Sequence, residues 1–211
     1  MDIIKNKQDK LTYIGISLGG TSNMESAAAI LDKNLNIIKL DKLFSMQDVE
    51  FFIDNLPGKA NSVINVSIPE NETMISCKWK YASRTYHAVN LNSNLINKDD
   101  WTNRFSSRGS EYLLETKNKG IDIIRYDIDN VKKEIGFCAP FKNRSPIDCK
   151  AIQNSLKMKF KIKELPSNML PVAQLEAILG AILACTITNG VENEDYKRLY
   201  TYNDIDVLGF C

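Results

Sequence analysis

The stretch Leu11 to Asp32, LTYIGISLGGTSNMESAAAILD, decides how the rest of the chain folds. Its pattern predicts a strand over Thr12 to Leu18, a tight turn at Gly19-Gly20-Thr21 and a second strand over Ser26 to Leu31. The glycine pair can adopt backbone angles closed to other residues, so the chain can reverse there into an antiparallel hairpin. Side chains alternate along the first strand, with Tyr13, Gly15 and Ser17 on one face and Ile14, Ile16 and Leu18 on the other.

The residues after this hairpin predict an α/β fold with a mixed sheet. A third strand over Ile37 to Leu40 is followed by a helix from Ser45, where Asp48 stands at the spacing of a capping box. Pro57 ends that helix, and the strand over Ser62 to Ile68 should pair parallel to its neighbour because a helix connects the two. Later elements are predicted as a helix over Trp101 to Lys117, a strand over Ile121 to Ile128, helices from Ser145 and over Val172 to Thr188, and a short strand over Ile205 to Phe210.

Length and composition predict one globular domain over residues 1–211, with an insertion or arm at about 72–100. The chain is 44% hydrophobic and 25% charged, and its formal net charge of +1 gives no global field for nucleic acid or an anionic membrane. Five widely spaced cysteines without a C-x-x-C pair predict reduced thiols. The N-terminal MDIIKNKQDK lacks the apolar core of a signal peptide, and no apolar run reaches membrane-spanning length, so we expect a cytoplasmic protein without a membrane partner.

Three segments carry a family resemblance: YIGISLGG with AAAILD at the opening hairpin, SVINVSIPEN at the next core strand, and LPVAQLEAILGAILACTITNG at the last helix. They resemble a poorly characterised ribonuclease H-like family of predicted nucleases, over most of the chain outside roughly 74–97. The resemblance implies a ribonuclease H-like mixed five-stranded sheet, with antiparallel hairpins followed by parallel strands, flanked by helices. It also implies metal-dependent phosphodiester hydrolysis.

The resemblance places acidic metal ligands on the first strand, a later parallel strand and the last helix, because paired divalent ions need several hard oxygen ligands. The matching residues are Ser17, Asn65 and Glu176. Only Glu176 is charged, so the resemblance implies weak binding of Mg²⁺ or Mn²⁺ and a nuclease activity that is weakened or lost. Asp127 and Asp129, at the end of a predicted core strand, are further catalytic candidates that could restore charge if they reach this site.

Each of these positions also has a purely structural interpretation. Glu176 can be a first-turn glutamate stabilised by the N-terminus of its helix. Ser17 can be a small strand residue, and Asn65 can be a hydrogen-bonded turn former. His87 is the sole histidine, so the sequence gives no reason to expect a histidine metal site. A catalytic Cys-His dyad of His87 with Cys77 is likewise unsupported.

Two groups of residues suit an anion. Gly19, Gly20 and Thr21 could hold a phosphate with backbone N–H groups, although a glycine pair at a hairpin is more often only a turn. Cationic side chains suited to phosphate oxygens, whose alternative is a solvated helix face, are Arg104, Arg108, Lys142, Arg144 and Lys150.

Three functional hypotheses follow. The first is a metal-dependent nuclease in which Glu176 and a core-strand aspartate hold the metal and Arg104 and Arg108 hold nucleic acid. The second is a non-catalytic binding module for a nucleotide, a small anion or a protein partner. The third, a sugar-kinase-like phosphotransferase suggested by Leu18 to Thr21, ranks last because such enzymes need a second domain of similar size. Substrate and oligomeric state cannot be chosen from the sequence.

Overall fold

The computed structural model describes residues 12–18, 26–44, 46–56, 62–67, 117–118, 120–136, 146–202 and 205–211. It is a mixed α/β structure with one seven-stranded sheet in the order β3-β2-β1-β4-β5-β7-β6. The strands are β1 (Thr12–Ser17), β2 (Ser26–Leu31), β3 (Ile37–Leu43), β4 (Ser62–Ser67), β5 (Asp122–Tyr126), β6 (Tyr196–Tyr202) and β7 (Ile205–Phe210).

The pairing of the strands follows the predicted hairpin and crossover. β1 is antiparallel to β2, and β2 is antiparallel to β3. Helix α1 (Met46–Asp54) connects β3 to β4, and β4 lies parallel to β1 as a crossover requires. β5 is parallel to β4, and β7 is parallel to β5.

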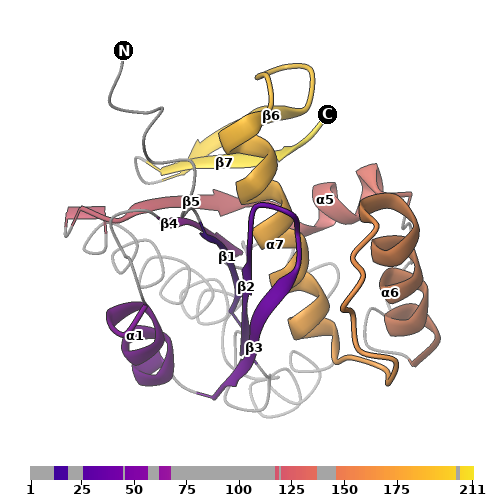
Figure 1. Ribbon diagram of the computed structural model, residues 1–211. Coiled ribbons are helices and arrows are strands. Elements are labelled where there is room, and N and C mark those ends of the chain that lie inside the picture. Colours follow the sequence, from indigo (N-terminus) through magenta and orange to yellow (C-terminus); the bar gives the residue numbers. More distant parts are fainter. Residues whose placement is uncertain are drawn as a thin grey trace, which may run out of the picture.

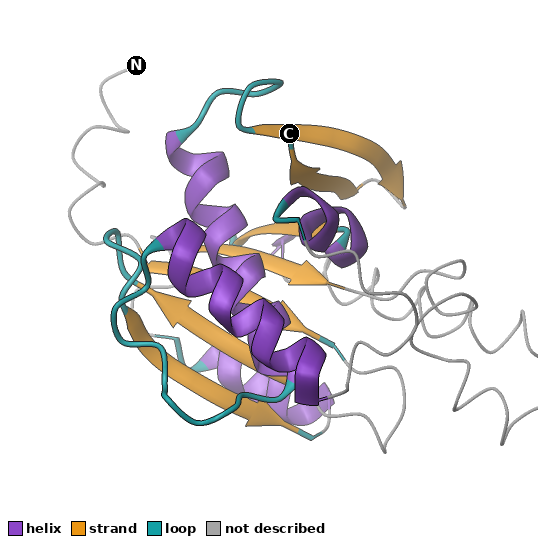
Figure 2. Ribbon diagram, turned by 90° about the vertical axis from the view of Figure 1, so that its right-hand side faces the viewer, coloured by secondary structure: helices purple, strands orange, loops and turns teal. Residues whose placement is uncertain are grey.

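Helices cover both faces of the sheet (Figures 1 and 2). Helix α1 lies on one face, and α5 (Ile128–Glu134), α6 (Pro146–Phe160) and α7 (Val172–Asn189) lie on the other. The core is divided in the same way. One apolar cluster joins Ile14 and Ile16 of β1 to the inner face of α1, and the second joins Ala27 and Ala29 of β2 to α6 and α7. The alternation predicted for β1 is therefore confirmed.

Helix α7 packs directly against the backbone of β1 at Gly15. A Cβ atom at this position would clash with the carbonyl oxygen of Ala177 and with the backbone nitrogen of Ala181. Those neighbours are backbone atoms, so they cannot rotate away. Gly15 therefore allows α7 to approach the sheet more closely than any residue with a side chain would.

The prediction of five strands is wrong, because the chain after α7 adds the hairpin β6–β7 next to β5. Of this hairpin, only the strand over Ile205 to Phe210 was predicted. The predicted strand over Ile121 to Ile128 is also too long, since β5 ends at Tyr126 and the unpredicted helix α5 begins at Ile128. The segment at 72–100 and almost all of the predicted helix over Trp101 to Lys117 lie outside the described residues.

Helix α7 is long and apolar enough to cross a membrane by length and composition, the one such helix in the part of the chain that the structure describes. Yet 72% of its 18-residue window is buried inside the protein. The residues that would face lipid instead contact β1, β2 and β4. Its apolar character is thus accounted for by its position in the core.

Replacing Gly15 should destabilise the protein through a steric clash. We expect Gly15→Ala to lower the free energy of unfolding by about 3 kcal/mol or more, because the added methyl group meets backbone on α7. Gly136→Ala is the matched control: Gly136 has a φ of +80° and nothing within 4 Å of the added atom. This variant should lower the free energy of unfolding by only about 1 kcal/mol, because alanine is strained at a positive φ. Urea denaturation measures both values, and an equal loss of unfolding free energy in Gly15→Ala and Gly136→Ala would contradict the steric clash.

Candidate functional site

Glu176 carries the only acidic side chain that is fully buried among the described residues, and it lies at the centre of a polar cluster. Its carboxylate is 1% exposed and both oxygens are engaged. Oε2 accepts a hydrogen bond of 2.7 Å from the hydroxyl of Ser17, and Oε1 lies 2.7 Å from the ammonium nitrogen of Lys132. The first-turn interpretation is wrong, since α7 begins at Val172 and has no acidic residue in its first turn.

Ser17 meets Glu176 because β1 ends directly beneath the N-terminal half of α7. Ser17 is the last residue of β1 and lies on the same face as Gly15, where the backbone of α7 packs against the strand. A larger residue at Ser17 would press against the helix, and an apolar one could not donate to the carboxylate. The predicted meeting of Ser17 and Glu176 is therefore seen as a direct hydrogen bond.

Asn65 faces the same helix, but it forms a hydrogen bond with the backbone of α7 and not with the carboxylate of Glu176. It is opposite Gly15 in the β1–β4 register, two residues before the position opposite Ser17. Its side-chain nitrogen donates to the carbonyl oxygen of Gly180 at 3.3 Å, one turn of α7 beyond Glu176. Its side-chain oxygen is buried and has no hydrogen-bond partner among the described residues. The interpretation of Asn65 as a satisfied turn former is wrong, because it lies inside β4.

Tyr126 fixes the same turn of α7 from the adjacent strand. Its hydroxyl donates to the backbone carbonyl oxygen of Glu176 at 2.7 Å. The ring reaches that atom by passing over Gly180, where an added Cβ would lie 2.6 Å from the ring. The backbone of Glu176 is held from β5 while its side chain is held from β1 and α5.

Lys132 is the residue that sequence reasoning missed. It lies on α5, with its side chain 4% exposed, and forms a buried ion pair with Glu176. Asp127 begins this helix, because its Oδ1 accepts the backbone N–H of Asn130 at 3.0 Å. The signal is the sequence IDNVKKE after Asp127, but the predicted strand extends to Ile128 and no element is predicted for the residues that follow. Even a correct helix would not have shown which of the two adjacent lysines faces inward.

Cys149 of α6 lies close enough to Glu176 and Lys132 for their charges to affect its thiol. Burial raises the pKa of its thiol, the neighbouring carboxylates of Asp148 and Glu176 act in the same direction, and the ammonium of Lys132 opposes them. The thiol therefore stays protonated at neutral pH. It contributes a small apolar side chain to the core rather than a thiolate ligand.

A divalent metal does not fit this set of donors. Such an ion needs several hard, anionic oxygen ligands, and the cluster offers one carboxylate whose oxygens are already bound to Ser17 and Lys132. Ser17 and Asn65 are neutral. Within the described ranges, no group of three or more His, Cys, Asp or Glu residues could hold a metal ion.

The other predicted site residues are distributed as follows. Asp127 caps α5, Asp129 lies in the first turn of α5 with its side chain outside the described part, and Lys150 is exposed on α6. The remaining predicted residues lie outside the described residues, namely Gly19, Gly20, Thr21, Cys77, His87, Arg104, Arg108, Lys142 and Arg144. Their roles stay predictions.

Comparison with known proteins gives structural likeness without a sequence match. No family model matches the sequence, and no curated protein matches it. Among solved structures, the chain is similar to T. thermophilus RuvC in complex with a Holliday junction substrate, with a TM-score of 0.41 and 12% sequence identity. That match covers 84% of this chain and 93% of the RuvC chain.

Removing one member of the buried ion pair should destabilise the protein more than replacing both members. We expect Lys132→Met to lower the free energy of unfolding by about 3–5 kcal/mol, because it leaves the carboxylate of Glu176 buried and uncompensated. The double variant Lys132→Met with Glu176→Gln should recover much of this loss, as measured by urea denaturation.

The matched control is Lys133→Met, a change of the neighbouring exposed lysine on the same helix. It should change stability by less than about 0.5 kcal/mol. If the loss of unfolding free energy in the double variant equals the sum of the losses in Lys132→Met and Glu176→Gln, the two residues are not coupled.

Proposed function

We propose that this chain is a non-catalytic binding module built on a ribonuclease H-like sheet. The fold part of the proposal is supported by the strand order β3-β2-β1-β4-β5, by the antiparallel pairing of the first three strands and by the parallel pairing that follows. The helix that carries Glu176 crosses β1, β2 and β4, as the family resemblance implies for the last helix. The hairpin β6–β7 is an addition to that plan.

One observation carries the functional part of the proposal: the ion pair between Lys132 and Glu176, 2.7 Å long and buried on both sides. The ammonium supplies the positive charge that the single buried carboxylate requires. For a divalent cation to bind, Lys132 would have to leave and a charge of +2 would face one carboxylate in a dry site. Removing paired charges from such a site costs several kcal/mol, so the lysine outcompetes the metal.

Helix α6 offers the surface through which such a module could bind an anionic partner. Lys150 and Lys157 are exposed and lie seven residues apart, which places them on one side of the helix. Lys161 is also exposed and follows directly after Phe160, the last residue of α6. None of the three forms an ion pair with another described residue. We propose that this basic face contacts the phosphate backbone of a nucleic acid, without cleaving it.

The first test is metal binding followed by calorimetry. We expect no saturable binding of Mg²⁺ or Mn²⁺ to the wild-type chain, and no metal-dependent cleavage of single-stranded DNA, duplex DNA or RNA, because Lys132 occupies the carboxylate. The alternative is an active metal-dependent nuclease. Saturable Mn²⁺ binding that disappears in Glu176→Gln, together with cleavage, would establish that alternative and overturn our proposal.

The second test concerns the basic face of α6. We expect the triple variant Lys150→Gln, Lys157→Gln, Lys161→Gln to bind labelled DNA or RNA more weakly, and to lower the slope of log affinity against log salt by about one for each lysine in contact. Fluorescence anisotropy measures both quantities.

A matched control removes the same charge elsewhere, at the exposed residues Lys33, Lys117 and Lys133. This control triple variant should bind like the wild type. If both triple variants lose the same affinity, net charge rather than α6 governs binding. If the wild type binds no nucleic acid at all, the proposed ligand is wrong while the non-catalytic assignment stands.

A further inference from the structure

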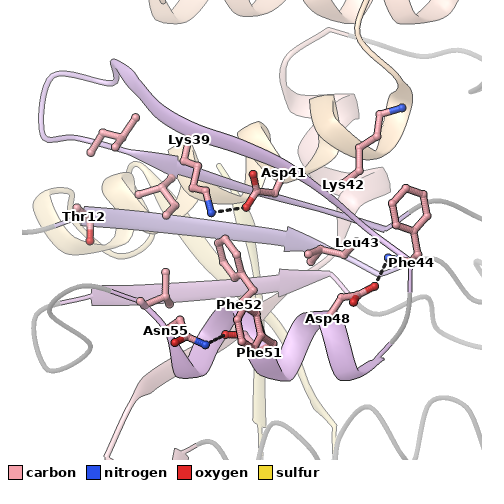
Figure 3. A pocket seen from close by; sticks show the side chains of 13 residues that line it. Thr12, Lys39, Asp41, Lys42, Leu43, Phe44, Asp48, Phe51, Phe52 and Asn55 are labelled. Atoms are coloured by element: carbon pink, nitrogen blue, oxygen red, sulfur yellow. Dashed lines mark hydrogen bonds and ion pairs between the residues drawn. The ribbon is translucent and has the colours of Figure 1, made fainter.

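The face of the sheet opposite Glu176 carries an apolar pocket beside an open strand edge. The pocket has a volume of about 720 Å³ and lies between β3 and α1 (Figure 3). Three large apolar side chains on its lining are exposed to solvent: Ile38 (57%), Phe44 (73%) and Phe51 (70%). Among the residues that the structure describes, β3 pairs with β2 alone and forms one end of the sheet. An open edge beside exposed aromatic side chains is a surface that another strand can cover.

The sequence of β3 is complementary to itself when read in the opposite direction. If two copies pair antiparallel with Leu40 at the centre, then Lys39 lies opposite Asp41 of the second copy, and Asp41 lies opposite its Lys39. Both side chains are on the α1 face, since Ile30 is opposite Lys39 and Ala28 is opposite Asp41 in the β2–β3 register. Directly opposite charges of unlike sign stabilise a strand pair.

Neighbouring registers are unfavourable for the same reason. Moving the centre by one residue places Lys39 against Lys39 or Asp41 against Asp41, and like charges directly opposite each other destabilise a pair. In one copy, Lys39 and Asp41 already form an ion pair of 2.6 Å along the strand (Figure 3). The two side chains are therefore positioned on the same face, where a second copy can exchange partners with them.

We propose that β3 pairs with β3 of a second copy of this chain, so that two sheets join into one continuous sheet centred on Leu40. A second copy is the occupant that fits, because it brings the complementary charges in register and its own apolar side chains to the same edge. The dimer would cover open backbone groups of β3 and remove Ile38, Phe44 and Phe51 from water in part. This inference does not depend on the proposed loss of catalysis.

Sedimentation equilibrium of the full chain tests the dimer. We expect the wild type to shift from monomer to dimer as its concentration rises through the micromolar range. Lys39→Asp should weaken the dimer roughly tenfold or more, because both unlike pairs become like pairs. The double variant Lys39→Asp with Asp41→Lys should restore the dimer, because the pairing is complementary again with the signs exchanged.

The control is Lys33→Asp, which makes the same change in net charge in the turn before β3, outside the paired residues. It should leave the dimer unchanged. A wild type that is monomeric throughout, including one that instead takes a foreign peptide into the pocket, would overturn the proposal. So would a dimer that is unaffected by Lys39→Asp, or one that the double variant fails to restore.

Discussion

The close contact between α7 and β1 is the constraint on which the polar cluster depends. Because Gly15 has no side chain, the backbone of α7 lies directly against the strand, and Glu176 is enclosed between the sheet and the helices α5 and α6. A carboxylate in such a place must be neutralised or hydrogen bonded. Ser17 and Lys132 meet that requirement from two different elements. The packing therefore determines the chemistry, and the ion pair is its consequence.

The two faces of the sheet differ in what they leave accessible. On the α7 face, the side chains are closed off by three helices, and the polar groups there interact with each other. On the α1 face, α1 is the one helix among the described residues, and a pocket and exposed aromatic residues lie beside β3. The position that the family resemblance marks as catalytic is thus the less accessible one. The contacts that we propose with other molecules therefore lie on α6 and at the β3 edge.

The predictable part of the structure is the part with a strong local period. The alternation along β1 predicted the division of the core into two clusters. Helix α7 begins where the sequence predicts, after Pro171. Helix α5 and strand β6 were missed. A seven-residue helix that directly follows a strand shows too few turns for a helical period to be recognised.

The sequence by itself determined the hairpin and the crossover, because both follow from the order of elements and the period of side chains. The meeting of Ser17 with Glu176 was implied by the resemblance to a ribonuclease H-like family. Only the tertiary structure decided that Lys132 neutralises Glu176, because the two residues are 44 positions apart and belong to helices that come together through the packing of the core. It also decided that Asn65 contacts the carbonyl of Gly180 rather than the carboxylate, since the register of β4 against β1 places it one helical turn away. Charges that meet across a folded core leave no local pattern in the chain, and for that reason composition and spacing could not reveal the lysine.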